Sequence, residues 1–170
     1  LSEDEVTRAL EAHKSGNAEI PVLLSKICQG RVGWAIQAIQ QPEVLENRRE
    51  TLDHVKNLTK HGVAHKINYA SELAELYSEN RSSLIQTFRW IISFWRDIIL
   101  IKCGAPEAVC NHDVKKMLID QSKDYDMQEL ISAIKSTTHT MELLNANANP
   151  RLVIEHLFLT LKNNTMTSLK

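Results

Sequence analysis

Glycine and proline are scarce in this chain of 170 residues. The chain has five glycines and four prolines, about half of average usage. Few turn-forming residues imply few turns and long elements, which favours helices. Aromatic residues make up only 5%, and no alternating strand pattern bounded by Asn-Gly or Gly-Asn occurs, which argues against an all-β sandwich. The sequence therefore predicts an all-α fold built as a helical bundle.

An excess of charge of one sign is also absent. The chain has 20 Lys and Arg against 21 Asp and Glu, for a net charge of −1, and no third of it carries an excess of more than one basic residue. This removes the simplest basis for a nucleic-acid-binding surface or an anionic-membrane partner. Arg89, Arg96 and Asp97 interrupt the most apolar segment, so no run of 18 apolar residues exists and we expect no membrane-spanning helix.

Cysteine is sparse and odd in number, with three residues and no C-x-x-C pair, which is typical of a reducing, intracellular compartment. We therefore expect a cytoplasmic protein without a disulfide framework, and we expect Cys28 and Cys103 to be buried in the core. The N-terminus does not resemble a signal peptide. Because the chain starts at Leu1 and not at Met, we also expect it to be part of a longer or processed protein.

Apolar residues recur at helical spacing along nearly the whole chain, and capping residues mark where helices begin and end. We expect caps at Ser2, Asn17, Asn111, Asp126 and Asn149, the last followed by Pro150 at the first helical position. The widest apolar pattern predicts a helix at the centre of the bundle. The expected helices span residues 2–14, 17–29, 32–40, 43–61, 64–78, 82–103, 111–122, 126–145 and 150–162.

Signatures of catalysis and of metal or phosphate binding are missing. A zinc protease needs Glu after the first His of an i, i+4 pair, but Gly62 lies between His61 and His65. None of the seven histidines follows a Glu by three residues, as a di-iron bundle would require. No GxxxxGK or GxGxxG loop occurs. We therefore predict no catalytic, cofactor-binding or metal-binding residues, and two exposed histidines near a turn.

The large side chains Trp34, Trp90 and Trp95 are candidates either for the core or for an interface, because Trp is enriched at binding hot spots. Trp90 is the best interface candidate, since it falls off the main apolar stripe of its helix. Phe158 exceeds what one buried stripe of the last helix requires. The predicted partner interface therefore consists of Trp90, Phe158 and Arg151, the last of which lies at the start of that helix.

Three segments resemble the C-terminal region of the delta-prime subunit of bacterial DNA polymerase III. Residues 94–104, FWRDIILIKCG, are similar to the R-D-L-L-L-L-K-x-G helix of that family, and residues 147–155, NANPRLVIE, to its N-x-N-P-R-L-x-L-E helix start. Residues 30–36, GRVGWAI, resemble its G-S-P-G-x-A-L turn, with Arg31-Val32 in place of Ser-Pro. The segments occur in the order of the family and roughly at its spacing.

The resemblance implies a clamp-loader subunit, in which a nucleotide-binding-type domain and a lid precede an all-helical collar. Residues 1–41 would be the end of the AAA+ lid subdomain, residues 43–165 the collar domain for oligomerisation, and 166–170 a tail. The family's five collars form a ring in a machine that uses ATP to load the sliding clamp on primed DNA. The nucleotide-binding-type domain would then lie upstream of Leu1.

The partners implied are the gamma/tau and delta subunits, contacted through the collar, whereas the clamp and DNA are reached only through the assembly. The gamma/tau subunits place an arginine in the lid turn as a phosphate sensor, and the corresponding position here is Gly33. This difference favours delta-prime, with gamma/tau as the second interpretation.

The residues alone are also compatible with an unrelated helical adaptor or a helical enzyme, and self-association stays open. The fragment itself is predicted not to be an enzyme, although the parent assembly belongs to a DNA polymerase holoenzyme.

Overall fold

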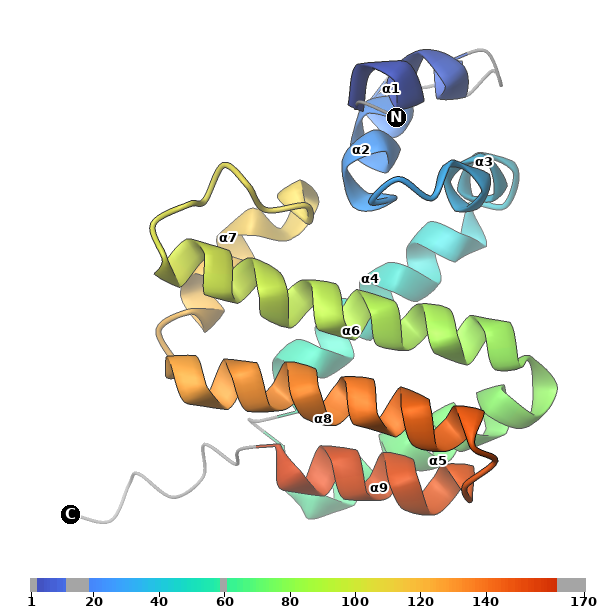
Figure 1. Cartoon of the computed structure of the whole chain (residues 1–170), viewed down its shortest axis with the longest axis vertical. Coiled ribbons are helices and arrows are strands. Elements are labelled where there is room, and N and C mark those ends of the chain that lie inside the picture. The colour runs from blue at the N-terminus through green and yellow to red at the C-terminus, as the bar shows by residue number, and fades with distance from the viewer. Residues whose placement is uncertain (1–2, 12–18, 59–60, 162–170) are drawn as a thin grey trace.

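The computed structural model describes residues 3–11, 19–58 and 61–161. Every regular element in these ranges is a helix, which confirms the all-α prediction (Figure 1). The elements are α1 (Glu3–Glu11), α2 (Glu19–Ile27), α3 (Val32–Gln40), α4 (Glu43–Asn57), α5 (Val63–Glu79), α6 (Arg81–Lys102), the 3-10 turn η1 (His112–Val114), α7 (Lys115–Gln121), α8 (Met127–Asn145) and α9 (Pro150–Thr160).

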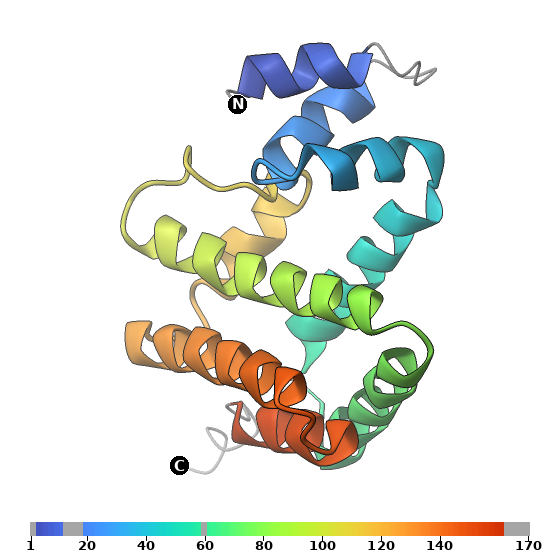
Figure 2. The ribbon, with the colours of Figure 1, turned by 45° about the vertical axis from the view of Figure 1, so that its right-hand side comes forward.

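Helices α1, α2 and α3 form a small N-terminal unit, which lies at one end of the molecule in both ribbon views (Figures 1 and 2). The unit has its own apolar core, and α4 leads from it into the rest of the chain. Residues Gln29 and Gly30 both have positive φ, 50° and 81°, which turns the chain sharply between α2 and α3. The buried core residues are Val6, Leu10, Leu24, Ile27, Cys28, Ala35 and Ala38.

The 22-residue helix α6 lies at the centre of a larger C-terminal bundle. Helices α4, α5, α7 and α8 all pack against it, and α9 packs against α5 and α8. Its apolar residues at steps of three and four bury Phe88, Ile91 and Trp95 completely, as the width of the stripe predicts. Asn80 is the N-cap of α6, and its side chain accepts a hydrogen bond from the amide of Ser83 at 3.1 Å.

The N-termini of the last two helices, α8 and α9, agree best with the predicted caps. Asp126 and Glu129 form the capping box of α8, and Asn149 caps α9 with Pro150 in its first turn. The predicted cap at Asn111 is wrong, because its side chain makes no capping hydrogen bond, is 3% exposed and bonds to other buried groups. The predicted caps at Ser2 and Asn17 lie outside the described residues.

Helices α6 and α8 each end with a residue in the left-handed region. Gly104 has φ of 77° after α6, and the amide of Ala105 donates to the carbonyl of Leu100 at 2.9 Å. Asn147 has φ of 60° after α8, and the amide of Ala148 donates to the carbonyl of Leu143 at 3.0 Å. Both are Schellman-type ends, which satisfy carbonyls that the helix leaves unpaired.

The cysteines divide between core and surface. Cys28 is completely buried in the N-terminal unit, which confirms one prediction. Cys103 is exposed, so the prediction that it lies in the core is wrong, because it follows α6 as its C-cap and not within its apolar stripe. Among the described helices, none combines the length and the apolar character that crossing a lipid bilayer requires.

Candidate interaction surface

Phe158 lies inside the bundle and not on its surface. Its exposed fraction is 0%, and its ring stacks on Tyr69 of α5 with the centroids 5.3 Å apart. The spacing explains the burial, because Ile154, Leu157 and Phe158 lie within four residues of one another and form the inner face of α9. The expectation that Phe158 lies outside the core is therefore wrong.

Trp90 is also buried, with 7% of its surface exposed. Its ring meets Trp34 of α3 in an edge-to-face arrangement, with the centroids 6.2 Å apart. The expectation that Trp90 lies outside the core is wrong, because α6 is central and is covered on more than one side. Trp90 anchors an internal contact, namely the one between the N-terminal unit and the C-terminal bundle.

Polar side chains reinforce this contact. Gln29 donates a hydrogen bond to Ser93 Oγ of α6 at 3.1 Å, and Arg31 donates to Gln86 Oε1 at 3.3 Å. Arg31 also donates to the carbonyl of Cys28 at 3.2 Å. Burial lowers the pKa of the Arg31 guanidinium, and the nearby charge of Arg89 lowers this pKa further. The turn between α2 and α3 is thus held against α6.

The position that the resemblance equates with a phosphate-sensing arginine is Gly33, which lies exposed in the first turn of α3. A Cβ at Gly33 would meet no atom within 4 Å, so space alone does not demand glycine there. Arg31, displaced by two residues, is engaged with Cys28 and Gln86. In this conformation the guanidinium of Arg31 therefore faces its own chain.

Arg151 is the one residue of the predicted interface that lies at the surface. Its side chain is 63% exposed, and its Nε donates to Glu155 Oε1 at 2.8 Å within α9. Two large apolar side chains share the outer side of this helix, because Leu152 is 63% and Leu159 43% exposed. They are seven residues apart, which is about two helical turns. The outer face of α9, defined by Arg151, Leu152 and Leu159, is thus partly apolar.

A buried polar network is the main feature that the sequence patterns did not predict. The Asp97 carboxylate of α6 is completely buried and accepts hydrogen bonds from the amides of Cys110 and Asn111 at 3.0 and 2.8 Å, and from the Asn111 side chain at 2.8 Å. Arg96 donates to its second oxygen at 2.9 Å. The motif carboxylate therefore fastens the loop after α6 to the helix itself.

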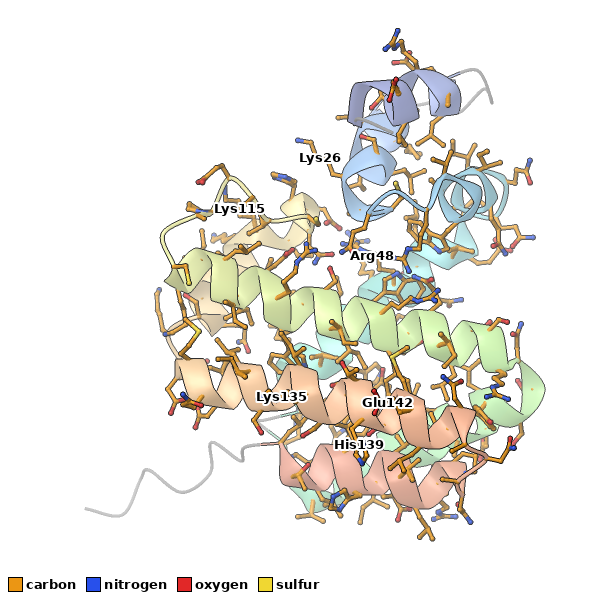
Figure 3. The ribbon with its side chains drawn as sticks, in the orientation of Figure 1. Lys26, Arg48, Lys115, Lys135, His139 and Glu142 are labelled. Carbon is orange, nitrogen blue, oxygen red and sulfur yellow. The ribbon has the colours of Figure 1, made fainter. Side chains whose placement is uncertain are left out.

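The network continues to α4 through Arg48, which is 2% exposed. Arg48 donates to Asn111 Oδ1 at 2.6 Å and to both oxygens of Asp113 at 2.7 and 3.0 Å. Figure 3 labels Arg48 where α4 passes α6. Asn111 also donates to Ser93 Oγ, the atom that Gln29 reaches from the N-terminal unit. One chain of hydrogen bonds thus links four segments.

Arg96 combines two opposing effects on its pKa. Burial alone would lower the pKa of the guanidinium, but hydrogen bonds to Asp97 and to Cys110 Sγ, the latter at 2.7 Å, outweigh burial and raise it. Arg96 therefore stays a cation, as the Asp97 carboxylate beside it requires.

A signal for these buried polar residues is present in the sequence. Arg48 occupies an apolar-stripe position of α4, four residues after Val44 and four before Leu52. Lys66 lies in the same way within the buried face of α5, where it is completely buried and its Nζ donates to the carbonyl of Leu161 at 2.7 Å. Desolvation lowers the pKa of this ammonium. A charged residue within an apolar stripe is the pattern that indicates a buried hydrogen-bonding role.

The histidines predicted near a turn lie together with a third. The His61 and His65 rings are 4.5 Å apart by their centroids, and His54 of α4 is 6.0 Å from His65 and 4.4 Å from Tyr69. His61 is exposed and His65 half-buried. Burial lowers the pKa of His65, and the charges of His61 and His54 lower it further. No metal-binding group of three or more His, Cys, Asp or Glu side chains occurs in the described part of the chain.

These features define an all-helical domain in which the Asp97 carboxylate organises a bundle whose last helix, α9, has a partly apolar outer face. Comparison with protein families agrees with this class. Residues 42–163 match the family described as DNA polymerase III, delta subunit, C terminal, and the chain belongs to that family. It is therefore a clamp-loader component of the polymerase, of a non-catalytic kind. The match covers α4 to α9 and leaves out the N-terminal unit.

Delta and delta-prime are not distinguished by this match. Comparison with curated proteins and with solved structures found no match. The interpretation as an unrelated helical adaptor is thereby replaced by membership of the clamp-loader family.

Proposed function

We propose that the chain is the C-terminal part of a delta-prime-type clamp-loader subunit and that residues 43–165 form its collar domain. The family match over residues 42–163, which begins one residue before α4, carries the assignment of the collar domain. The choice of delta-prime rests on the resemblance of residues 30–36, 94–104 and 147–155 to the delta-prime family. In this proposal the collar holds the subunit in a five-membered ring with the gamma/tau and delta subunits. The clamp and primed DNA are then reached only through the whole assembly.

Residues 1–41 are, in the same proposal, the last helices of an AAA+ lid subdomain. Their separate apolar core supports this division. The glycine at position 33, where the gamma/tau subunits carry a sensing arginine, supports delta-prime over gamma/tau. A subunit of this kind binds no ATP through these residues, and isothermal titration with Mg-ATP is expected to give no heat of binding.

The outer face of α9 is the proposed ring contact. Arg151, Leu152 and Leu159 lie on it, and a stable interface buries such apolar side chains together with a polar rim. Phe158 supports this face from beneath, within the core. Of the three residues of the interface predicted from the sequence, Arg151 is retained as a direct contact in this proposal, and Trp90 is assigned to the internal contact with Trp34.

Co-elution with the collar domains of the gamma/tau, delta and delta-prime subunits of the same organism tests the proposal. Leu152→Ser and Leu159→Ser together are expected to weaken the complex by about thirtyfold, because each removes about 1 kcal/mol of apolar burial. Ile119→Ser, at a 40% exposed apolar residue of α7, is the control and is expected to co-elute normally. Binding to the gamma/tau and delta collars without binding to the delta-prime collar supports delta-prime. Normal co-elution of the double variant contradicts the α9 interface.

A further inference from the structure

A groove of about 530 Å³ lies beside the contact between the two units. Helices α4 and α5 follow one another along the chain and both pack against α6. His54 of α4 stacks on Tyr69 of α5, with the ring centroids 4.4 Å apart. The groove extends from this stack along the first half of α6 to Trp34 of α3. It is thus bordered by four helices, and a volume of this size accommodates several side chains of a bound segment.

The groove has an apolar base with buried donors. Trp34, Leu73, Leu76 and Trp90 line it, and Trp90 is more than nine-tenths buried. The Nε1 atoms of Trp34 and Trp90 and the Nε2 atom of Gln86 have no hydrogen-bond acceptor among the described residues. Buried polar atoms are normally paired, and an acceptor on a bound segment would pair with these donors.

One end of the groove is negatively charged. Glu50 of α4 and Glu72 of α5 both line the groove, and both are exposed. Neither takes part in an ion pair among the residues that the structure describes. Burial raises the pKa of the Tyr69 hydroxyl, and the charges of Glu72 and Glu50 raise this pKa further, in keeping with their place beside Tyr69 among the lining residues.

The other end is positively charged. Arg89 of α6 lines the groove and is exposed. Arg31 lies close enough for the charge of Arg89 to lower the Arg31 pKa, and it donates to Gln86, another lining residue. Two like charges held near each other leave an unbalanced positive potential. The groove is therefore dipolar along its length.

We propose that this groove binds a segment of another protein in which apolar side chains are flanked by a Lys or Arg on one side and an Asp or Glu on the other. The apolar side chains cover Trp90, Leu73 and Leu76. The cation lies between Glu50 and Glu72, and the anion lies at Arg89. This docking site is separate from the outer face of α9 and does not rest on the proposed collar function.

Selection from a display library of random 16-residue peptides, with the whole chain as the target, tests the proposal. The enriched peptides are expected to carry apolar residues between a basic and an acidic residue. Their affinity is expected to fall at least tenfold for Glu50→Lys with Glu72→Lys. The matched control is Glu107→Lys with Asp124→Lys, which changes two exposed carboxylates outside the groove by the same charge, and it is expected to bind like the parent chain.

A second test measures NMR chemical shifts and requires no substitution in the residues that line the groove. Binding of an enriched peptide is expected to shift the indole Hε1 resonances of Trp34 and Trp90 and to leave that of Trp95, which does not line the groove, in place. A peptide with the two charges exchanged is expected to bind at least tenfold more weakly. Failure to enrich any peptide, equal binding by the Lys variant, or shifts at Trp95 alone would each overturn the proposal.

Discussion

The N-terminal unit and the C-terminal bundle differ in what holds them together. The buried core of the unit consists of small and aliphatic residues, among them Leu24, Cys28 and Ala35. The bundle buries large aromatic side chains completely and adds the network around Asp97. Apolar burial contributes roughly in proportion to area, and small cores are marginal alone. We therefore expect the stability of the unit to depend on its contact with α6 more than the stability of the bundle depends on the unit.

The largest expected effect comes from truncation in the two cores. Phe158→Ala is expected to destabilise the bundle by about 3–5 kcal/mol, because it leaves a cavity under α9. Leu24→Ala is expected to open the N-terminal unit alone, with the urea midpoint of the bundle nearly unchanged. Urea unfolding followed by Trp fluorescence measures the first, and hydrogen exchange of amides in residues 19–40 measures the second. If both variants shift one common transition, the two regions form one cooperative unit and the contrast fails.

The network in the bundle is expected to give the next largest effect. Asp97→Ala removes the acceptor for the Cys110 and Asn111 amides and is expected to cost about 3 kcal/mol, because buried donors are left unpaired. Hydrogen exchange at these two amides is expected to accelerate along with the loss of stability. Asp120→Ala, which breaks an exposed pair with Lys123, is the control and should change stability by less than about 0.5 kcal/mol. Unchanged protection at Asn111 would show that the loop is held by other contacts.

The contact between the regions is expected to be weaker than either core. A double-mutant cycle with Trp34→Leu and Trp90→Leu is expected to give a coupling of about 0.5–1.5 kcal/mol, the range for aromatic pairs. Trp34→Leu combined with Trp95→Leu is the matched control, because these two rings do not pair with each other among the described residues, and their effects should add within about 0.5 kcal/mol. Additivity in the first cycle as well would mean that the Trp pair does not join the units.

The smallest expected effect depends on pH and concerns the junction of α4 and α5. Folding lowers the pKa of His65. At a pH below about 6.5, the unperturbed pKa of histidine, the unfolded chain therefore binds more protons at this residue than the folded chain does. Stability from this source is therefore complete above that pH and decreases as the pH falls below it. His65→Gln is expected to flatten the decrease between pH values of about 7.5 and 5 in urea titrations. His139→Gln, at an exposed residue of α8 (Figure 3), should retain it, and an unchanged slope for His65→Gln would exclude His65 as its source.

Local information in the sequence was sufficient for the helices of the C-terminal bundle. The apolar steps of three and four over residues 84–98 predict α6 as the central helix, which is confirmed. The predictions of caps at Asp126 and Asn149 are also confirmed, because capping depends on side chains within three residues of the helix start. The predicted division at residues 41–43 is not tested by the family match and stays a prediction.

The candidate site was less predictable, because surface and core cannot be told apart from one helix. Trp90 lies off the main stripe of α6, yet α3 covers it. Phe158 exceeds the stripe that α9 alone requires, yet Tyr69 of α5 packs on its ring. Both predictions fail because burial depends on which distant helix covers a face, and a single-helix pattern contains no information on that.

The sequence by itself determined the helical class, the positions of most helices and the motifs around Asp97 and Asn149 that point to the clamp-loader family. Only the tertiary structure decided that the Asp97 carboxylate is buried and accepts hydrogen bonds from Asn111, and that Arg48 of α4 donates to the Asn111 side chain. The physical reason is range. Helix formation and capping are satisfied by neighbours along the chain, whereas these buried charges have partners in segments 13 to 65 residues away, which only packing brings together.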